Sequence, residues 1–149
     1  MKLTWTYKSF NELTTLELYS ILKLRSEVFV VEQNCAYQDV DSKDIKSYHL
    51  MAFDGETLAA YSRILPPGLS FQEASIGRVI TAPSHRAKGI GITLIEKAIE
   101  AVSNTFHTSQ IKIGAQLYLR KFYESFGFAQ TSDVYLEDGI EHIEMLLKK

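Results

Sequence analysis

The sequence has little cysteine, little proline and almost no surplus of charge. Cys35 is the one cysteine among 149 residues, so an intramolecular disulfide is excluded and a cysteine-based metal site is not expected. The single cysteine favours a reducing compartment, and we expect no bound metal ion. Sixteen basic and 18 acidic residues leave a net charge of −2, which supplies no basic surface for phosphate backbones or anionic lipids. We therefore expect no nucleic acid and no membrane among the partners.

Long hydrophobic runs are missing as well. No stretch approaches the roughly 18 apolar residues that span a bilayer, and residues 1–8 contain no apolar targeting core. The expected location is cytoplasmic. Hydrophobic residues still make up 46% of the chain, which is enough for a core at this length without disulfides or metals. With no repeat and no linker, the sequence predicts a single domain over residues 1–149.

The periodicity of apolar residues predicts a mixed α/β fold of the α+β type, in which helices cover a central sheet. Alternation predicts strands over residues 4–9, 49–65, 74–81 and 111–115 and a hairpin around 138–139, with a turn at Asp54-Gly55 inside the second run. Helical spacing predicts a helix over residues 15–29, a second helix that begins near residue 91 and continues past residue 102, and a short third helix that ends at residue 127. Residues 32–48 are polar and rich in aspartate, so we expect a long ordered loop or a short helix there.

One short motif indicates a ligand. Arg86-Ala87-Lys88-Gly89-Ile90-Gly91 separates a predicted strand from a predicted helix. Glycines allow close backbone approach, the N–H groups at a helix start bind phosphate oxygens, and Arg86 and Lys88 add charge. The spacing fits neither a P-loop nor a dinucleotide fingerprint. By itself the motif also fits an ordinary capped turn.

This loop, its flanking elements and the helix containing Phe122-Tyr123-Glu124-Ser125-Phe126-Gly127-Phe128 resemble the GNAT superfamily of acyl-CoA-dependent N-acetyltransferases. Segment 28–41 looks like the ElaA-like subgroup. The resemblance implies a central, twisted, mostly antiparallel sheet with helices on both faces. It implies acetyl-CoA as donor, a primary amine as acceptor, either small or on a protein, and a homodimer as one assembly to expect.

The resemblance also implies roles for individual residues. The loop Arg86 to Gly91 would wrap the CoA pyrophosphate, and the backbone of Val79, Ile80 and Thr81 would pair with the pantetheine arm. An N–H group of Val79 or Ile80 would stabilise the oxyanion. Tyr123 would protonate the leaving thiolate, since a phenol with a pKa of about 10 stays a donor at neutral pH. The alternative for Tyr123 is packing in the core with Phe122 and Phe126.

The general base is not fixed by the resemblance. Many relatives have a glutamate in the strand before the loop, whereas Ser75 lies near that position and is too weak a base. Glu73, His49 and His142 are the candidates, acting directly or through water, and each also fits an ordinary structural role. Loss of the base would leave a non-catalytic acyl-CoA-binding domain, which is one alternative function.

Arg25, Asp39, Asp41 and Arg63 form a candidate acceptor side. Their spacing also resembles acyl-homoserine-lactone synthases, a distant branch of the same fold that serves as the second alternative, although the Arg86–Gly91 loop favours a CoA donor. These arginines could equally pair with carboxylates to hold segment 32–48. The carboxylates, with Asp44, could instead attract a cationic amine.

Cys35 is a rival nucleophile for the transfer. It has no histidine next to it in the sequence, and a lone cysteine is more often inert than catalytic. We therefore expect direct attack by the amine.

Overall fold

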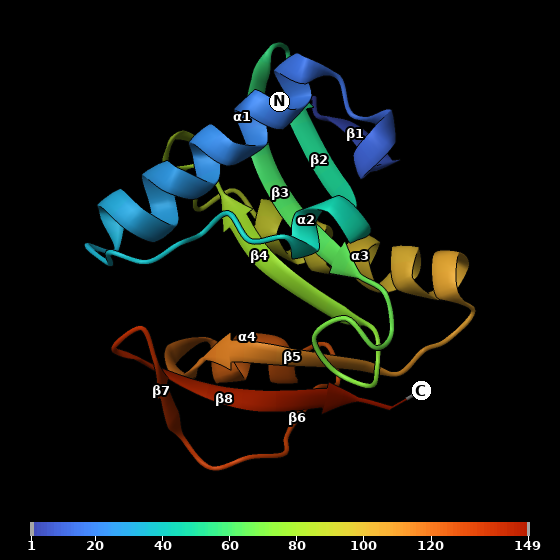
Figure 1. Ribbon diagram of the computed structural model, residues 1–149, viewed down its shortest axis with the longest axis vertical. Helices are drawn as coiled ribbons and strands as arrows, with labels where there is room; N and C mark the ends of the chain where they lie inside the picture. Colours follow the sequence, from blue (N-terminus) through green and yellow to red (C-terminus); the bar gives the residue numbers. More distant parts are fainter. Residues whose placement is uncertain (1, 149) are drawn as a thin grey trace.

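The computed structural model describes residues 2–148 and consists of two β-sheets with helices on both sides (Figure 1). The strands are β1 (Thr4–Ser9), β2 (Tyr48–Asp54), β3 (Thr57–Leu65), β4 (Ser75–Thr81), β5 (Ile111–Gln116), β6 (Ala129–Gln130), β7 (Tyr135–Glu137) and β8 (Ile140–Leu147). The α-helices are α1 (Thr15–Arg25), α2 (Lys43–Lys46), α3 (Ile90–Phe106) and α4 (Arg120–Glu124). A π-helix, η2 (Ser26–Glu32), continues α1, and short 3-10 turns are η1 (Phe10–Glu12), η3 (Pro83–His85) and η4 (Leu117–Leu119).

The first sheet has the order β1-β2-β3-β4, and all neighbours are antiparallel. Gly55 turns the β2–β3 hairpin with φ +61°, a value that favours glycine. Because side chains alternate along a strand, the two faces of this sheet join two different cores. Ala52 and Ala60 pack with residues of α3, whereas Met51 and Tyr61 pack with residues of α1. The two long helices therefore cover opposite faces of the sheet (Figure 1).

The second sheet is built around β8. β5 pairs with one edge of β8, from Ile111 opposite Leu147 to Gln116 opposite His142, and β6 and β7 pair with its other edge. The predicted C-terminal hairpin is present as β7 and β8. The predicted α+β class, with mostly antiparallel strands and helices on both faces, is confirmed. Within residues 2–148 no helix is both long enough and apolar enough to cross a membrane.

The two sheets meet at one end only. A parallel bridge joins Ala74 to Ile111, and the Lys112 N–H donates to the Ala74 carbonyl at 2.9 Å. Beyond this point β4 and β5 belong to different sheets and diverge toward Thr81 and Gln116 (Figure 1). Both are edge strands there, so their facing backbone groups have no strand partner. The sequence pattern predicted both strands but not their separation.

Candidate active site

A large cavity lies where β4 and β5 diverge. Its volume is about 1130 Å³, which is sufficient for a large organic ligand. It is lined by all of β4, by Ile113 to Gln116 of β5, and by side chains from the segment after α1, the β3–β4 loop, α4 and the β7–β8 hairpin. Val79, Ile80 and Thr81, the residues expected to pair with a pantetheine arm, lie along one wall.

The predicted phosphate-binding loop lies beside the Thr81 end of this cavity. Ala87 and Gly89 have φ values of +63° and +75°, so the loop turns sharply into α3. No side chain caps α3, and the first N–H groups of a helix have no acceptor within the helix. A Cβ on Gly91 would lie 3.8 Å from Thr81 Oγ1, which shows how closely the helix start approaches β4. The arrangement provides backbone donors and a positive helix end for an anion.

Arg86 is already engaged by a carboxylate. Its Nη1 and Nη2 donate to Glu32 Oε2 and Oε1, both at 2.6 Å, and its Nε donates to the Thr81 carbonyl at 3.2 Å. Both side chains are 43% exposed. The hydrogen bonds with Glu32 raise the pKa of Arg86 and lower the pKa of Glu32. Glu32 thus pairs with two of the three guanidinium nitrogens of Arg86.

Tyr123 lies in the cavity wall and in the core at once. It is 6% exposed, lines the cavity, and packs edge-on against Phe122 and Phe128 with ring centroids 5.3 and 5.9 Å away. Burial, and then the nearby Tyr118, raise the pKa of Tyr123 above its ordinary value. Among the described residues its hydroxyl has no hydrogen-bond partner, so the phenol is a protonated donor available to the cavity.

A β-bulge interrupts β4 at Arg78. Tyr61 lies opposite Ile80, but Arg63 lies opposite Gly77, so β4 contains an extra residue. Arg78 has φ +48°, a left-handed conformation that a non-glycine residue rarely adopts. A bulge of this kind turns the backbone locally, and here it does so at the centre of the cavity wall.

Of the three candidate bases, His142 is the one that lines the cavity. It is 7% exposed, its Nδ1 donates to the Ile140 carbonyl at 2.8 Å, and its Nε2 lies 3.5 Å from Glu137 Oε2. Because a carbonyl can only accept, Nδ1 carries the proton and Nε2 holds the lone pair of the neutral ring.

The other two candidates lie elsewhere. His49 is 1% exposed and is not part of the cavity wall; its Nε2 donates to the Asp44 carbonyl at 3.0 Å, and its Nδ1 accepts from the Tyr61 hydroxyl at 2.7 Å. Burial lowers the pKa of His49, partly opposed by Asp44, so the ring is held neutral with both nitrogens occupied. Glu73 is half-buried just before β4 and also lies outside the cavity wall.

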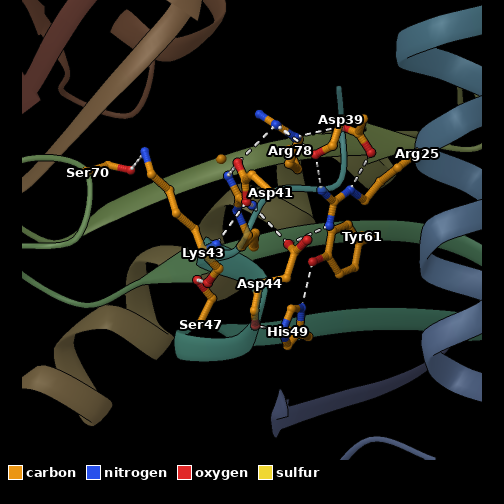
Figure 2. A network of polar contacts seen from close by, with 12 residues as sticks. Arg25, Asp39, Asp41, Lys43, Asp44, Ser47, His49, Tyr61, Ser70 and Arg78 are labelled. Carbon is orange, nitrogen blue, oxygen red and sulfur yellow. Dashed lines mark hydrogen bonds and ion pairs between the residues drawn. The ribbon is translucent and has the colours of Figure 1, made fainter. Parts of the chain in front are cut away.

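Three arginines and three aspartates form a network of ion pairs (Figure 2), and Asp41, Arg63 and Arg78 of this network line the cavity. This arginine–aspartate network comprises Arg25, Arg63, Arg78, Asp39, Asp41 and Asp44.

Arg25, fully buried at the end of α1, donates from Nε to Asp39 Oδ2 at 2.9 Å and from Nη1 to Asp44 Oδ1 at 2.6 Å. Arg63 Nη1 donates to Asp41 Oδ1 at 2.6 Å and to Asp44 Oδ1 at 2.9 Å. Arg78 Nε lies 2.7 Å from Asp39 Oδ1. The network therefore ties segment 39–44 to α1, β3 and β4.

The charges of this network balance. Burial opposes ionisation of Asp41, but its hydrogen bonds and ion pairs with Arg63 lower its pKa. Burial likewise disfavours the charge on Arg25, yet hydrogen bonding to Asp44 and the neighbouring carboxylates raise its pKa. With one arginine for each aspartate, the network gives no electrostatic reason to expect a cationic acceptor. The pairing that would hold segment 32–48 in place is present in the structure.

Several site residues escaped the sequence analysis. Arg78 was not singled out, although an arginine in a strand next to a ligand-binding turn is a signal that could have drawn attention. Glu32 and Lys43 had no signal, since their partners are distant in the sequence. Glu137 was not singled out either, although its partner His142 lies a few residues further along the chain. Cys35 lines the cavity, and its thiol donates to the Asp138 carbonyl at 3.3 Å. Within residues 2–148 no cluster of histidine, cysteine and acidic side chains is arranged to hold a metal ion.

Comparison with known proteins now identifies the family. The family model described as "Acetyltransferase (GNAT) domain" matches residues 15–149. The chain belongs to this family. It is 40% identical to the protein ElaA of Escherichia coli over 143 residues, covering 95% of this chain and 94% of ElaA. The crystal structure of E. coli ElaA superposes with a TM-score of 0.93, covering 99% of this chain and all of ElaA.

Two further structures extend the comparison. The crystal structure of an acyl-CoA N-acyltransferase from Pseudomonas aeruginosa matches with a TM-score of 0.94 and 41% identity, covering 98% of this chain and 99% of that chain. A CoA-dependent acyl-homoserine lactone synthase, BjaI, matches with a TM-score of 0.78 at 15% identity, covering 97% of this chain and 82% of its own. The second likeness shows a shared fold alone. The GNAT and ElaA-like resemblance noted in the sequence is confirmed.

Proposed function

We propose that this GNAT protein is an acetyl-CoA-dependent N-acetyltransferase in which a primary amine attacks the thioester directly. The observation that supports this most strongly is the cavity between the edge strands β4 and β5, whose lining includes Arg86, Tyr123 and His142. GNAT domains use acyl-CoA as a substrate, and the cavity offers an anion site at one end and candidate proton-transfer groups within it.

The donor would lie between β4 and β5. The N–H groups at the start of α3, with Arg86 and Lys88, would bind the pyrophosphate. The unpaired edge of β4 at Val79, Ile80 and Thr81 would hydrogen-bond to the amides of the pantetheine arm, as an added strand would. The bulge at Arg78 would aim a backbone N–H of Val79 or Ile80 at the thioester oxygen.

The transfer itself would exchange a thioester for an amide. The amine nitrogen forms a bond to the acetyl carbon, the negative charge moves to the carbonyl oxygen, and the C–S bond then breaks as the carbonyl reforms. After the neutral amine has attacked, its nitrogen loses one proton and the sulfur gains one from Tyr123. The proton from the nitrogen returns to the Tyr123 oxygen through water, so the phenol is restored. The products are the N-acetylated acceptor and CoA with a free thiol. Cys35 is assigned no part in the transfer, since its thiol donates to the Asp138 carbonyl and to no described base.

His142 would accept the proton of the incoming ammonium group. His142 lines the cavity and its Nε2 carries the lone pair of the neutral ring, and Glu137 beside this nitrogen would stabilise the imidazolium that forms. Ser75 stands where many relatives have a catalytic glutamate, so proton removal would come from β8, on the other side of the cavity, rather than from β4.

Calorimetric titration with acetyl-CoA tests the donor site. We expect saturable binding at one site, lost in Gly89→Glu because the new carboxylate would face the pyrophosphate. Gly55→Glu is the matched control, since Gly55 also has positive φ and open space around its Cα but lies in the β2–β3 turn away from the cavity. It introduces the same strain and the same charge, and binding should be unchanged. Absence of binding in the parent protein would contradict the proposal.

Release of free CoA thiol in the presence of an amine separates an enzyme from a binding domain. A transferase releases thiol in proportion to the amide formed, whereas a non-catalytic acyl-CoA-binding domain binds the donor without turnover. An acyl-homoserine-lactone-synthase-like activity would instead require a lactone product, which mass spectrometry distinguishes from a simple acetamide.

A further inference from the structure

Lys43 and Ser75 line the cavity, and neither side chain has an acidic partner among the described residues. Lys43 Nζ donates to Ser70 Oγ at 2.8 Å and forms no ion pair with any described residue. Ser75 is 4% exposed, lines the cavity, and its hydroxyl has no partner among residues 2–148.

Buried donors without partners are rare, because each costs free energy when it leaves water unpaired. Every arginine that lines the cavity has a carboxylate partner, so Lys43 is the surplus positive charge on this wall of the described chain. Figure 2 shows its side chain extended away from the arginine–aspartate network toward Ser70. A charged amine and two hydroxyls, from Lys43, Ser70 and Ser75, together make a site for an anionic oxygen group.

From this we infer that the acceptor amine also has a carboxylate, which binds to Lys43, Ser70 and Ser75. This inference rests on the proposed function, and it names the substrate class of the same site. At the other end of the acceptor, Glu137 and His142 suit an ammonium group before its deprotonation. The acceptor would therefore be zwitterionic, with its two charged groups held at opposite ends of the cavity.

The strands set the distance between those groups. β4 and β5 point in the same direction from the Ala74–Ile111 bridge, although they move apart. Val79 and Gln116, each five residues beyond the bridge, lie at about the same level, and His142 is opposite Gln116. Ser75 precedes Val79 by four positions, or about 13 Å along an ideal strand and less across the bulge. Allowing for the contacts at each end, amine and carboxylate should be on the order of 10 Å apart, which is about the length of an extended tripeptide.

The inference predicts that a short peptide is a better acceptor than a free α-amino acid, whose two charged groups are too close together. An ω-amino acid with an alkyl chain of the same length has the same two charged end groups but no peptide bonds. Comparing its KM with that of triglycine shows whether the peptide backbone is recognised as well.

The test measures thiol release at saturating acetyl-CoA with glycine, diglycine, triglycine and triglycine amide. Triglycine should have a lower KM than glycine and than its amide, which lacks the carboxylate. Lys43→Gln should raise the KM for triglycine about 10-fold or more and leave that for the amide unchanged. Lys46→Gln is the matched control, because Lys46 is an exposed lysine on the same helix α2 and lies outside the cavity wall. Ser70→Ala should act like Lys43→Gln, more weakly.

The outcomes separate this inference from the proposed function. If acetyl-CoA does not bind, both are wrong. If acetyl-CoA binds and the two tripeptides have equal KM values, or neither is acetylated or bound, the carboxylate site is wrong while the donor site remains. If Lys43→Gln changes the KM values of triglycine and triglycine amide by the same factor, Lys43 stabilises the cavity wall and binds no carboxylate.

Discussion

Glu32 and Arg86 form a two-point ion pair across the mouth of the cavity, 54 residues apart in sequence. Glu32 ends the π-helix after α1, and Arg86 begins the loop that leads into α3. The pair thus connects the segment after α1 to the loop that leads into α3. Under the proposed function, a pyrophosphate group bound at Arg86 would meet the negative charge of Glu32, so donor binding and the position of Glu32 would be coupled.

Replacing Glu32 with glutamine should therefore tighten acetyl-CoA binding. An exposed ion pair is weak, so we expect the dissociation constant to fall by about two- to five-fold at low ionic strength, and the difference to shrink as salt is added. Glu27→Gln, on the same π-helix and exposed, removes the same charge away from Arg86 and should leave binding unchanged. Weaker binding in Glu32→Gln would mean that Glu32 holds Arg86 ready for the phosphate rather than competing with it.

Arg25 should be required for stability rather than for chemistry. It is fully buried, does not line the cavity, and joins Asp39 to Asp44. Arg25→Ala leaves two buried carboxylates with one partner fewer, which costs about 3–5 kcal/mol in the free energy of unfolding. Urea denaturation measures this cost. Lys23→Ala, exposed on the same helix, should change stability by less than about 0.5 kcal/mol, and an equally small effect for Arg25→Ala would refute the structural role.

His49 should make the protein less stable in mild acid. Burial lowers its pKa in the folded chain, so the unfolded chain, with a pKa of about 6.5, binds more protons in this range. The stabilisation is complete above that value and is lost as the pH falls below it toward the folded pKa. The unfolding free energy, measured in urea at pH 7.5 and 5.5, should drop less in His49→Gln than in the parent. His107→Asn, at an exposed helix end, should keep the parental slope.

The local elements were predictable because their signals are local. Asp54-Gly55 supplies the positive φ that the β2–β3 hairpin needs, and the apolar stripe of α3 follows helical spacing. The predicted helix over 15–29 extends to Glu32 because the chain changes from α- to π-helical hydrogen bonding at Ser26. β6 went unpredicted, since two residues carry no periodicity.

Individual residues of the candidate site could be predicted from the sequence, but the pairs of residues that meet in the folded chain could not. The loop at residues 86–91 stands out by composition, whereas the gap between β4 and β5 depends on the two strands failing to pair, which no residue type signals. For Arg25 and Arg63 the sequence left open pairing with carboxylates or contact with the acceptor, and which carboxylate each one meets depends on how segment 32–48 folds back. The conformation of Arg78, with positive φ, is a product of tertiary packing and runs against its local preference.

Tyr123→Phe should slow turnover without weakening the binding of acetyl-CoA. The substitution removes one hydroxyl, keeps the packing against Phe122 and Phe128, and deprives the thiolate of its acid, so kcat should fall by about 100-fold or more. The acetyl-CoA dissociation constant should be unchanged by calorimetry. Because burial raises the pKa of Tyr123, the parent should show no loss of kcat from this group up to pH 9. Tyr19→Phe, on the exposed face of α1, is the control. Unaltered kcat in Tyr123→Phe would assign Tyr123 to the core alone.

His142→Gln should remove the base while preserving the wall. Glutamine retains a donor for the Ile140 carbonyl but cannot accept a proton, so the acceptor amine would have to arrive already neutral. We therefore expect kcat/KM for the amine to fall by about 100-fold at pH 7 and to recover as the pH rises toward the pKa of the amine itself. His49→Gln provides the comparison, because His49 is buried away from the cavity and its loss should leave the shape of the pH–rate profile unchanged. If His142→Gln retains the parental profile, proton removal does not pass through β8, and Glu73 acting through water becomes the next residue to replace.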